Sequence, residues 1–187
     1  METSALNSFL DFDRDLLLGL NGLSGRSWLD SFMLLVSAHW PWALLALVYV
    51  AWALKKRNVL KIKEFIWIAG TMIICDVVAA QGFKPWLARL RPCKVDGLVH
   101  IVDGCAGLYG LPSNHASNAA VFATMWFFLY GARQGFLAFS VAILVAVSRV
   151  YLGVHYPSDV LAGMAFGMIL GALSIRFYRA LSRSQAS

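Results

Sequence analysis

The sequence predicts an all-α protein, a polytopic transmembrane helix bundle that forms a single domain over residues 1–187. Two observations predict this class. The chain is 59% hydrophobic and only 14% charged, with a mean hydropathy of +0.66, which is more apolar surface than a soluble domain of this length buries. The apolar residues also gather into segments that approach the roughly 20 residues of a spanning helix.

Residues 1–27 precede these segments and predict a helix of another kind. Apolar residues recur near helical spacing with charged residues between them: Phe9, Phe12, Leu16, Leu17 and Leu20, with Asp11, Arg14 and Asp15. This pattern predicts an amphipathic helix that lies either at the membrane interface or docked on the bundle. The acids in Met1–Asp15, with no basic region before them, argue against a cleavable signal peptide.

Five apolar segments follow, and we expect five spans, with a sixth possible near the N-terminus. They are Phe32–Leu54, Phe65–Phe83, Ala116–Tyr130, Phe136–Val147 and Val160–Tyr178. The third is short but can extend back to Ser113, and the fourth can run on through Arg149 toward Leu152. Span ends that are buried in protein tolerate such polar residues.

Basic residues predict the orientation. They gather between the first two spans, between the third and fourth, and after the fifth: Lys55, Lys56, Arg57, Lys61, Lys63, Arg133, Arg176, Arg179 and Arg183. By the positive-inside rule these regions and the C-terminus are cytoplasmic, so the other loops face outward, and we expect a bacterial inner membrane. The net charge of +6 then reflects orientation and an anionic substrate rather than nucleic-acid binding.

The first of three polar groups closes the second span with Lys84 and Arg91-Pro92. Lys84 offers a compact charge, and Arg91 offers a planar fork that matches phosphate oxygens. Taken alone, the group is also typical of side chains that anchor a helix end.

The second group, Pro112-Ser113-Asn114-His115, opens the third span. Ser113 is an N-cap candidate, and a helix N-terminus binds anions readily. His115 in the first turn could protonate a leaving oxygen. The alternative is a simple cap beside an interfacial histidine.

The third group, Ser148-Arg149 with His155 and Asp159, joins the fourth and fifth spans. Asp159 can take a proton from one nitrogen of His155 and leave the other free to attack phosphorus. The alternative is a capping aspartate with an unrelated histidine. Because the chain reverses between groups, all three meet at one membrane face, where they suit phosphate binding and cleavage.

Together the groups resemble the type 2 phosphatidic acid phosphatase (PAP2) family of membrane lipid phosphatases, whose pattern is K-x6-R-P, P-S-G-H and S-R-x5-H-x3-D. The resemblance covers roughly Asp76 to Gly171. Every motif position matches except Asn114, which replaces the glycine. If that glycine permits a positive φ or a close backbone approach, asparagine is among the better substitutes.

The resemblance implies a role for each matching residue. His155 is the nucleophile that forms a phosphohistidine, Asp159 orients it, and His115 is the acid for the leaving group. The implied phosphate-binding residues are Lys84, Arg91, Ser113, Asn114 with its backbone N–H, Ser148 and Arg149. No metal or other cofactor is implied, because the cations supply the charge stabilisation.

The implied function is a metal-independent phosphatase that hydrolyses a terminal phosphate from a membrane lipid phosphate or diphosphate. Undecaprenyl diphosphate is our first choice, because it suits a small enzyme with an outward site. Phosphatidylglycerophosphate, phosphatidate and lipid A 1-phosphate are alternatives. A lipid phosphotransferase, or a non-catalytic phospholipid binder or carrier, is the alternative of another class. The sequence leaves the oligomeric state open.

The sequence also predicts the surroundings of several residues outside the motifs. Asp76 lies within the second span, where we expect it to make a structural hydrogen bond. We expect His39 to make an interior polar contact. Two acids of the outer loop, Asp96 and Asp103, are expected to be solvated. Cys93 and Cys105 share that loop, so an oxidising compartment permits a disulfide, although spacing alone leaves the pairing open.

Overall fold

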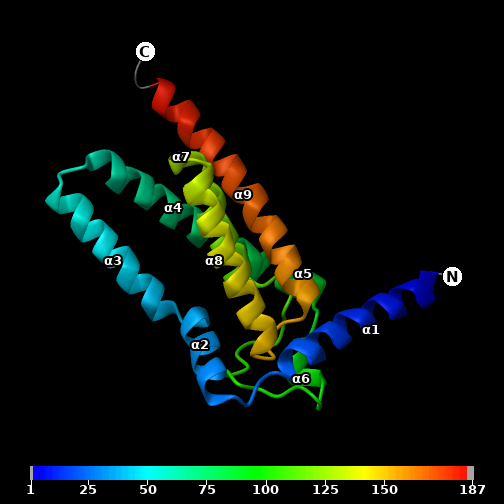
Figure 1. Ribbon diagram of the computed structural model, residues 1–187. Coiled ribbons are helices and arrows are strands. Elements are labelled where there is room, and N and C mark those ends of the chain that lie inside the picture. The colour runs from blue at the N-terminus through cyan, green and yellow to red at the C-terminus, as the bar shows by residue number, and fades with distance from the viewer. Residues whose placement is uncertain (1, 185–187) are drawn as a thin grey trace.

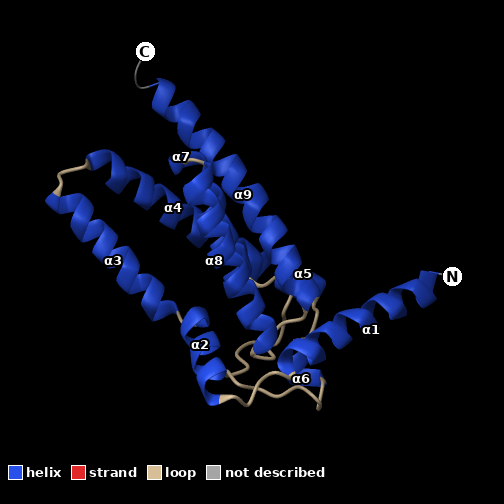
Figure 2. Ribbon diagram, in the orientation of Figure 1, coloured by secondary structure: helices blue, strands red, loops and turns tan. Residues whose placement is uncertain are grey.

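The computed structural model describes residues 2–184, which form helices and loops with no strand (Figure 2). The elements in chain order are α1 (Glu2–Asn21), α2 (Ser27–Ser37), α3 (His39–Lys55), α4 (Val59–Val77), the π-helical turn η1 (Val78–Phe83), α5 (Lys84–Leu87), α6 (Pro92–Val95), α7 (Asn114–Tyr130), α8 (Ala132–Tyr151) and α9 (Pro157–Ser184). The all-α prediction is therefore confirmed for this part of the chain.

Three helical segments of residues 2–184 are long and apolar enough to cross a membrane: Val59–Leu87, Ala132–Tyr151 and Pro157–Ser184. The pair α2–α3 makes a fourth if it counts as one span. Helix α7 has 17 residues and rises about 25 Å, which is less than the roughly 30 Å of a hydrocarbon core. The count of five spans is therefore not confirmed and stays a prediction.

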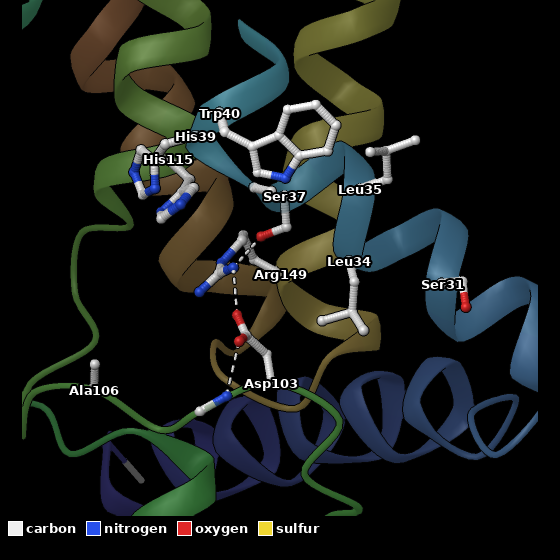
Figure 3. A pocket seen from close by; sticks show the side chains of 12 residues that line it. Ser31, Leu34, Leu35, Ser37, His39, Trp40, Asp103, Ala106, His115 and Arg149 are labelled. Atoms are coloured by element: carbon white, nitrogen blue, oxygen red, sulfur yellow. Dashed lines mark hydrogen bonds and ion pairs between the residues drawn. The ribbon is translucent and has the colours of Figure 1, made fainter. Parts of the chain in front are cut away.

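The first expected span, Phe32–Leu54, is not one straight helix, and the structure corrects that prediction. The helix breaks at Ala38, whose ψ of 146° is extended, and α2 and α3 meet at a bend of 50°. Only Ser37 and His39 interrupt the apolar sequence here, so hydropathy averaged over the segment gives little signal of the break. The bend places His39 and Trp40 beside the outer loops (Figure 3).

Helices α7, α8 and α9 lie side by side and form the centre of the bundle (Figure 1). The contact between α7 and α9 depends on small residues of α9. A Cβ at Gly163 would lie 2.6 Å from the Ser113 carbonyl oxygen, and one at Gly167 would lie 2.1 Å from that of Ser117. Glycines permit such close approach of helix backbones in membranes. The approach holds the start of α7 against the start of α9.

The segment between α5 and α7 holds the ends of these helices together. The backbone N–H of Gly110 donates to the Arg89 carbonyl (2.8 Å), and that of Arg91 donates to the Leu108 carbonyl (3.1 Å). Ala88, with a φ of 49°, turns the chain between α5 and this paired segment. The first polar group is thereby fixed beside the second.

Helix α1 docks on the loop end of the bundle through its C-terminal half and projects away from it through its N-terminal half (Figure 1). Leu17 is fully buried in a core cluster with Val150 and Val160. The Asn21 side chain donates to the carbonyls of His100 and Tyr151, both at 2.8 Å. Of the two predicted arrangements, the structure shows a helix docked on the bundle. Whether α1 also lies at the membrane interface stays a prediction.

Candidate active site

The site begins with a buried histidine and carboxylate pair at the start of α9. His155 Nδ1 lies 3.3 Å from Asp159 Oδ2, and the two side chains are 1% and 0% exposed. The backbone N–H of Tyr156 donates to the same carboxylate oxygen at 3.1 Å. The spacing of four residues around a helix start brings the ring and the carboxylate together. Asp159 therefore holds the imidazole by Nδ1 and leaves Nε2 available.

The free nitrogen faces a cation from another part of the chain. Nε2 of His155 lies 3.2 Å from a guanidinium nitrogen of Arg91, which is itself buried. Arg91 also donates to the carbonyls of Tyr109 (3.2 Å) and Val154 (3.3 Å), so its fork is held in place. A phosphate on Arg91 would therefore lie directly in front of Nε2.

Burial lowers the pKa of His155 to about 4, because desolvation and the positive charge of Arg91 outweigh the hydrogen bond to Asp159, which raises the pKa. We therefore expect the free enzyme to keep this imidazole neutral from pH 8 down to about pH 5. Its ¹⁵N signal, assigned by comparison with His155→Gln, would measure this in detergent. Titration near the ordinary histidine pKa of about 6.5 would contradict the described packing.

Ser113 joins the second polar group to the third. It is the N-cap residue of α7, and its backbone N–H donates to the Asp159 carbonyl at 3.0 Å. Its buried hydroxyl makes no hydrogen bond within residues 2–184, not even the expected cap bond. A buried hydroxyl at a helix N-terminus is well placed to bind an anion.

The remaining cations lie around this centre. Arg149 contacts the Ser37 hydroxyl and forms an ion pair with Asp103 at 3.2 Å, while its buried Nε has no partner among the described residues. Lys84 lies within electrostatic range of both arginines, and no described residue accepts a hydrogen bond from its ammonium group. The site therefore carries donor capacity that the protein itself does not use.

Two predicted phosphate-binding residues are placed differently. The Ser148 hydroxyl donates to the Val145 carbonyl at 2.7 Å, so it is directed into its own helix. The Asn114 amide donates to Asp76 Oδ1 at 2.5 Å, and Asn118 donates to the same atom at 3.3 Å. Asn114 begins a helix and has no positive φ, so this chain does not use the first of the two properties considered for the glycine position. Its side chain instead joins α7 to α4.

A cavity of about 700 Å³ adjoins the site and lies between the α2–α3 bend, the start of α7 and the end of α8. Figure 3 shows the imidazoles of His39 and His115 beside each other in it, with ring centroids 4.7 Å apart, and the Trp40 indole also lines it. His39 therefore lies at the site rather than making the interior contact expected from the sequence.

The family model of the PAP2 superfamily matches residues 65–183, which include every residue of the three polar groups. The chain belongs to the PAP2 superfamily. It is a membrane-embedded lipid phosphatase, so the enzyme prediction is confirmed and the non-catalytic binder or carrier is set aside.

Two PAP2 relatives match most of the chain. The lipid A 4'-phosphatase of Porphyromonas gingivalis is 32% identical over 90% of this chain and 74% of that protein. The lipid A 4'-phosphatase of Bacteroides thetaiotaomicron is 31% identical over 84% of this chain and 72% of that protein. The crystal structure of a transmembrane PAP2-type phosphatidylglycerolphosphate phosphatase from Bacillus subtilis superposes with a TM-score of 0.67. That match has 25% identity and covers 93% of this chain and 88% of the other.

The PAP2 motifs did not reveal two residues, Arg89 and Asp13, that help to hold the Asp159 carboxylate. Arg89 donates to Asp159 Oδ1 at 2.9 Å and to Asp13 Oδ2 at 2.6 Å. Asp13, buried in α1, also accepts from the backbone N–H of Ser158 at 2.8 Å. Arg89 stands two residues before Arg91 in a basic run, which is a weak signal, while nothing in the sequence near Asp13 points to this contact.

Asp13→Asn removes the charge that fixes Arg89 on Asp159. We expect kcat to fall about tenfold or more, as for other partners that orient a catalytic group, with KM nearly unchanged. Steady-state phosphate release would measure this. Asp11→Asn, on the exposed side of the same helix, is the matched control. Equal rates in the two variants would show that Asp13 has no influence on Asp159.

The outer loop differs from its expected solvated state. Asp96 forms an ion pair with Arg14 of α1, and Asp103 forms the pair with Arg149 described above. In the structure Cys93 and Cys105 form a disulfide, with their Cα atoms 6.1 Å apart. The bonded loop carries Asp103 to the edge of the cavity.

Proposed function

We propose that this enzyme removes the 4'-phosphate of a lipid A-type glycolipid through a phosphohistidine, with its site on the outer face of a bacterial inner membrane. The observation that carries the mechanism is His155, held by Asp159 at Nδ1 with Nε2 facing Arg91. The substrate rests on the likeness to lipid A 4'-phosphatases over 90% and 84% of the chain. This likeness does not favour undecaprenyl diphosphate, the substrate chosen first from the sequence.

The first step is attack of His155 Nε2 on phosphorus. The new P–N bond forms as the bond from phosphorus to the lipid oxygen breaks, and His115 gives its proton to that oxygen. The entering phosphate favours the protonated form of His115, because it brings negative charge beside the imidazole. Arg91, Arg149, Lys84 and the Ser113 hydroxyl stabilise the charge on the phosphate oxygens.

The second step returns the enzyme to its starting state. Water attacks the phosphohistidine, a new P–O bond forms, the P–N bond breaks, and His115 accepts the proton of the water. Asp159 stabilises the charge on the imidazole during both steps, as the carboxylate does in other triads.

Phosphate release from defined lipids tests the substrate. Purified protein in detergent, with chelator present, would receive lipid A with both phosphates, lipid A with only the 1-phosphate or only the 4'-phosphate, phosphatidylglycerophosphate, and undecaprenyl diphosphate. We expect release from the two lipids that carry the 4'-phosphate to be fastest, and mass spectrometry of the products would identify the position lost.

Three outcomes would change the proposal. Faster release from the 1-phosphate or from a non-glycolipid would replace the proposed substrate. A new phosphorylated lipid without free phosphate would show phosphoryl transfer. Cleavage at a face accessible only from the cytoplasm, measured in sealed vesicles of known orientation, would overturn the proposed topology.

A further inference from the structure

The cavity touches the site on one side only. Of the proposed catalytic and phosphate-binding residues, His115 and Arg149 line it, whereas His155, Lys84 and Arg91 do not. In phosphoryl transfer the attacking and leaving atoms lie on opposite sides of phosphorus. Because His155 attacks and His115 protonates the leaving oxygen, the leaving group extends toward His115 and into this cavity.

The size of the cavity exceeds what the phosphate requires. A volume of about 700 Å³ is within the range of roughly 300–1,000 Å³ found for sites that hold organic ligands. The α2–α3 bend at Ala38 creates one wall, since a straight helix would carry His39 and Trp40 elsewhere. The space is therefore a built feature of the outer end of the bundle.

The walls combine flat apolar surface with polar groups. Trp40, Leu34 and Leu35 supply the apolar surface. His39 supplies ring nitrogens, while the Ser31 hydroxyl donates to the Ser27 carbonyl at 2.7 Å and so offers only an acceptor, and the Ser37 hydroxyl accepts from Arg149. A sugar ring has the matching chemistry, because its C–H face packs on an indole while its hydroxyls hydrogen-bond at the rim.

The one acid in the wall indicates the charge of the leaving group. Asp103 pairs with Arg149 at 3.2 Å (Figure 3). A phosphate bound by Arg149 would leave the Asp103 carboxylate free to accept hydrogen bonds and to repel an anion. A leaving group that is itself a phosphate, as in a diphosphate substrate, would face this repulsion, whereas a neutral sugar would not.

We propose that this cavity is a leaving-group subsite that binds the neutral sugar of a glycolipid phosphate, with Trp40 as its packing surface and Asp103 as its acceptor. The proposal rests on the proposed function, because the proposed role of His115 as the acid for the leaving oxygen defines which side the lipid leaves from. It adds a reason for selectivity that the phosphate-binding motifs do not contain, since those motifs contact only the phosphate.

The test is the effect of Trp40→Ala on substrate preference. Trp40 is 63% exposed, so its removal leaves the fold intact, and Trp28→Ala is the matched control, because Trp28 is 69% exposed on α2 and does not line the cavity. We expect Trp40→Ala to lower kcat/KM for 4'-phosphorylated lipid A about tenfold or more. Its kcat/KM for phosphatidylglycerophosphate, which has no sugar, should change less than threefold, the approximate scatter of such measurements.

Asp103→Asn tests the charge of the same subsite. The ratio of kcat/KM for undecaprenyl diphosphate to that for 4'-phosphorylated lipid A should rise at least about fivefold, because the repulsion is removed. Comparing this ratio, rather than either kcat/KM alone, removes any effect of the substitution on Arg149 that changes both substrates equally.

The outcomes separate the subsite from the function. If wild-type enzyme releases the 4'-phosphate but Trp40→Ala lowers kcat/KM equally for all substrates, or for none of them, the cavity is not a sugar subsite. The proposed function then stands. If wild-type enzyme hydrolyses only lipids without a sugar, both proposals fall. An unchanged ratio in Asp103→Asn would overturn the role of the carboxylate.

Discussion

His155→Gln should abolish phosphate release from every lipid, with a loss of at least about 10⁴-fold in kcat. Nε2 of His155, the proposed nucleophile, faces Arg91 from within the buried pair with Asp159, and no other imidazole of the described residues has a carboxylate partner. Glutamine has similar volume and keeps a hydrogen bond to Asp159, so the packing around Arg91 remains. Binding of the lipid should persist while turnover stops.

His100→Gln is the matched control for this variant. His100 is exposed, and its ring nitrogen bonds only the Ser24 hydroxyl, outside the site. It should retain wild-type rates and the same elution from size-exclusion chromatography as His155→Gln. Residual turnover in His155→Gln above about 0.01% of wild type would show that another group attacks the phosphate.

His115→Gln should lower kcat on the lipid substrate by about 10²- to 10⁴-fold, the usual contribution of a general acid. His115 stands in the first turn of α7, at the cavity side of the site, within electrostatic range of His155 and both arginines. Without its proton the lipid oxygen must leave as an alkoxide, which is a poor leaving group.

An aryl phosphate distinguishes this role from a structural one. A nitrophenolate leaves readily without protonation, so the first step on such a substrate should lose far less in His115→Gln than on the lipid. Stopped-flow measurement of the nitrophenolate burst isolates that step from hydrolysis of the intermediate. An equal loss on both substrates would mean that His115 only supports the site, and an undiminished lipid rate would point to His39 as the acid.

The three polar groups could be found from the sequence because their chemistry is local. Asp159 follows His155 by four residues at a helix start, and that spacing alone brings the ring to the carboxylate. The convergence of the groups also followed from chain reversal between apolar segments. The structure agrees with both expectations: Arg91, Ser113, His155 and Asp159 are linked by direct hydrogen bonds.

The features that were missed depend on contacts between distant parts of the chain. Asp13 and Arg89 are 76 residues apart, and their pairing requires the docking of α1, which no local pattern specifies. The α2–α3 break is flanked by Ser37 and His39 within a long apolar segment, and two polar residues are too few to interrupt hydropathy averaged over a span. The cavity depends on that break, and for this reason the positions of His39 and Trp40 beside the catalytic groups could not be predicted.

The central claim is that phosphate passes through a covalent bond to His155. The enzyme would be mixed with 4'-³²P-labelled lipid A in the presence of chelator, quenched in alkali within milliseconds, and digested for peptide mapping. We predict a label that is stable in alkali, lost in acid, carried by the peptide containing His155, and missing in His155→Gln. A label on another residue, or turnover with no labelled protein at any time point, would contradict the phosphohistidine mechanism.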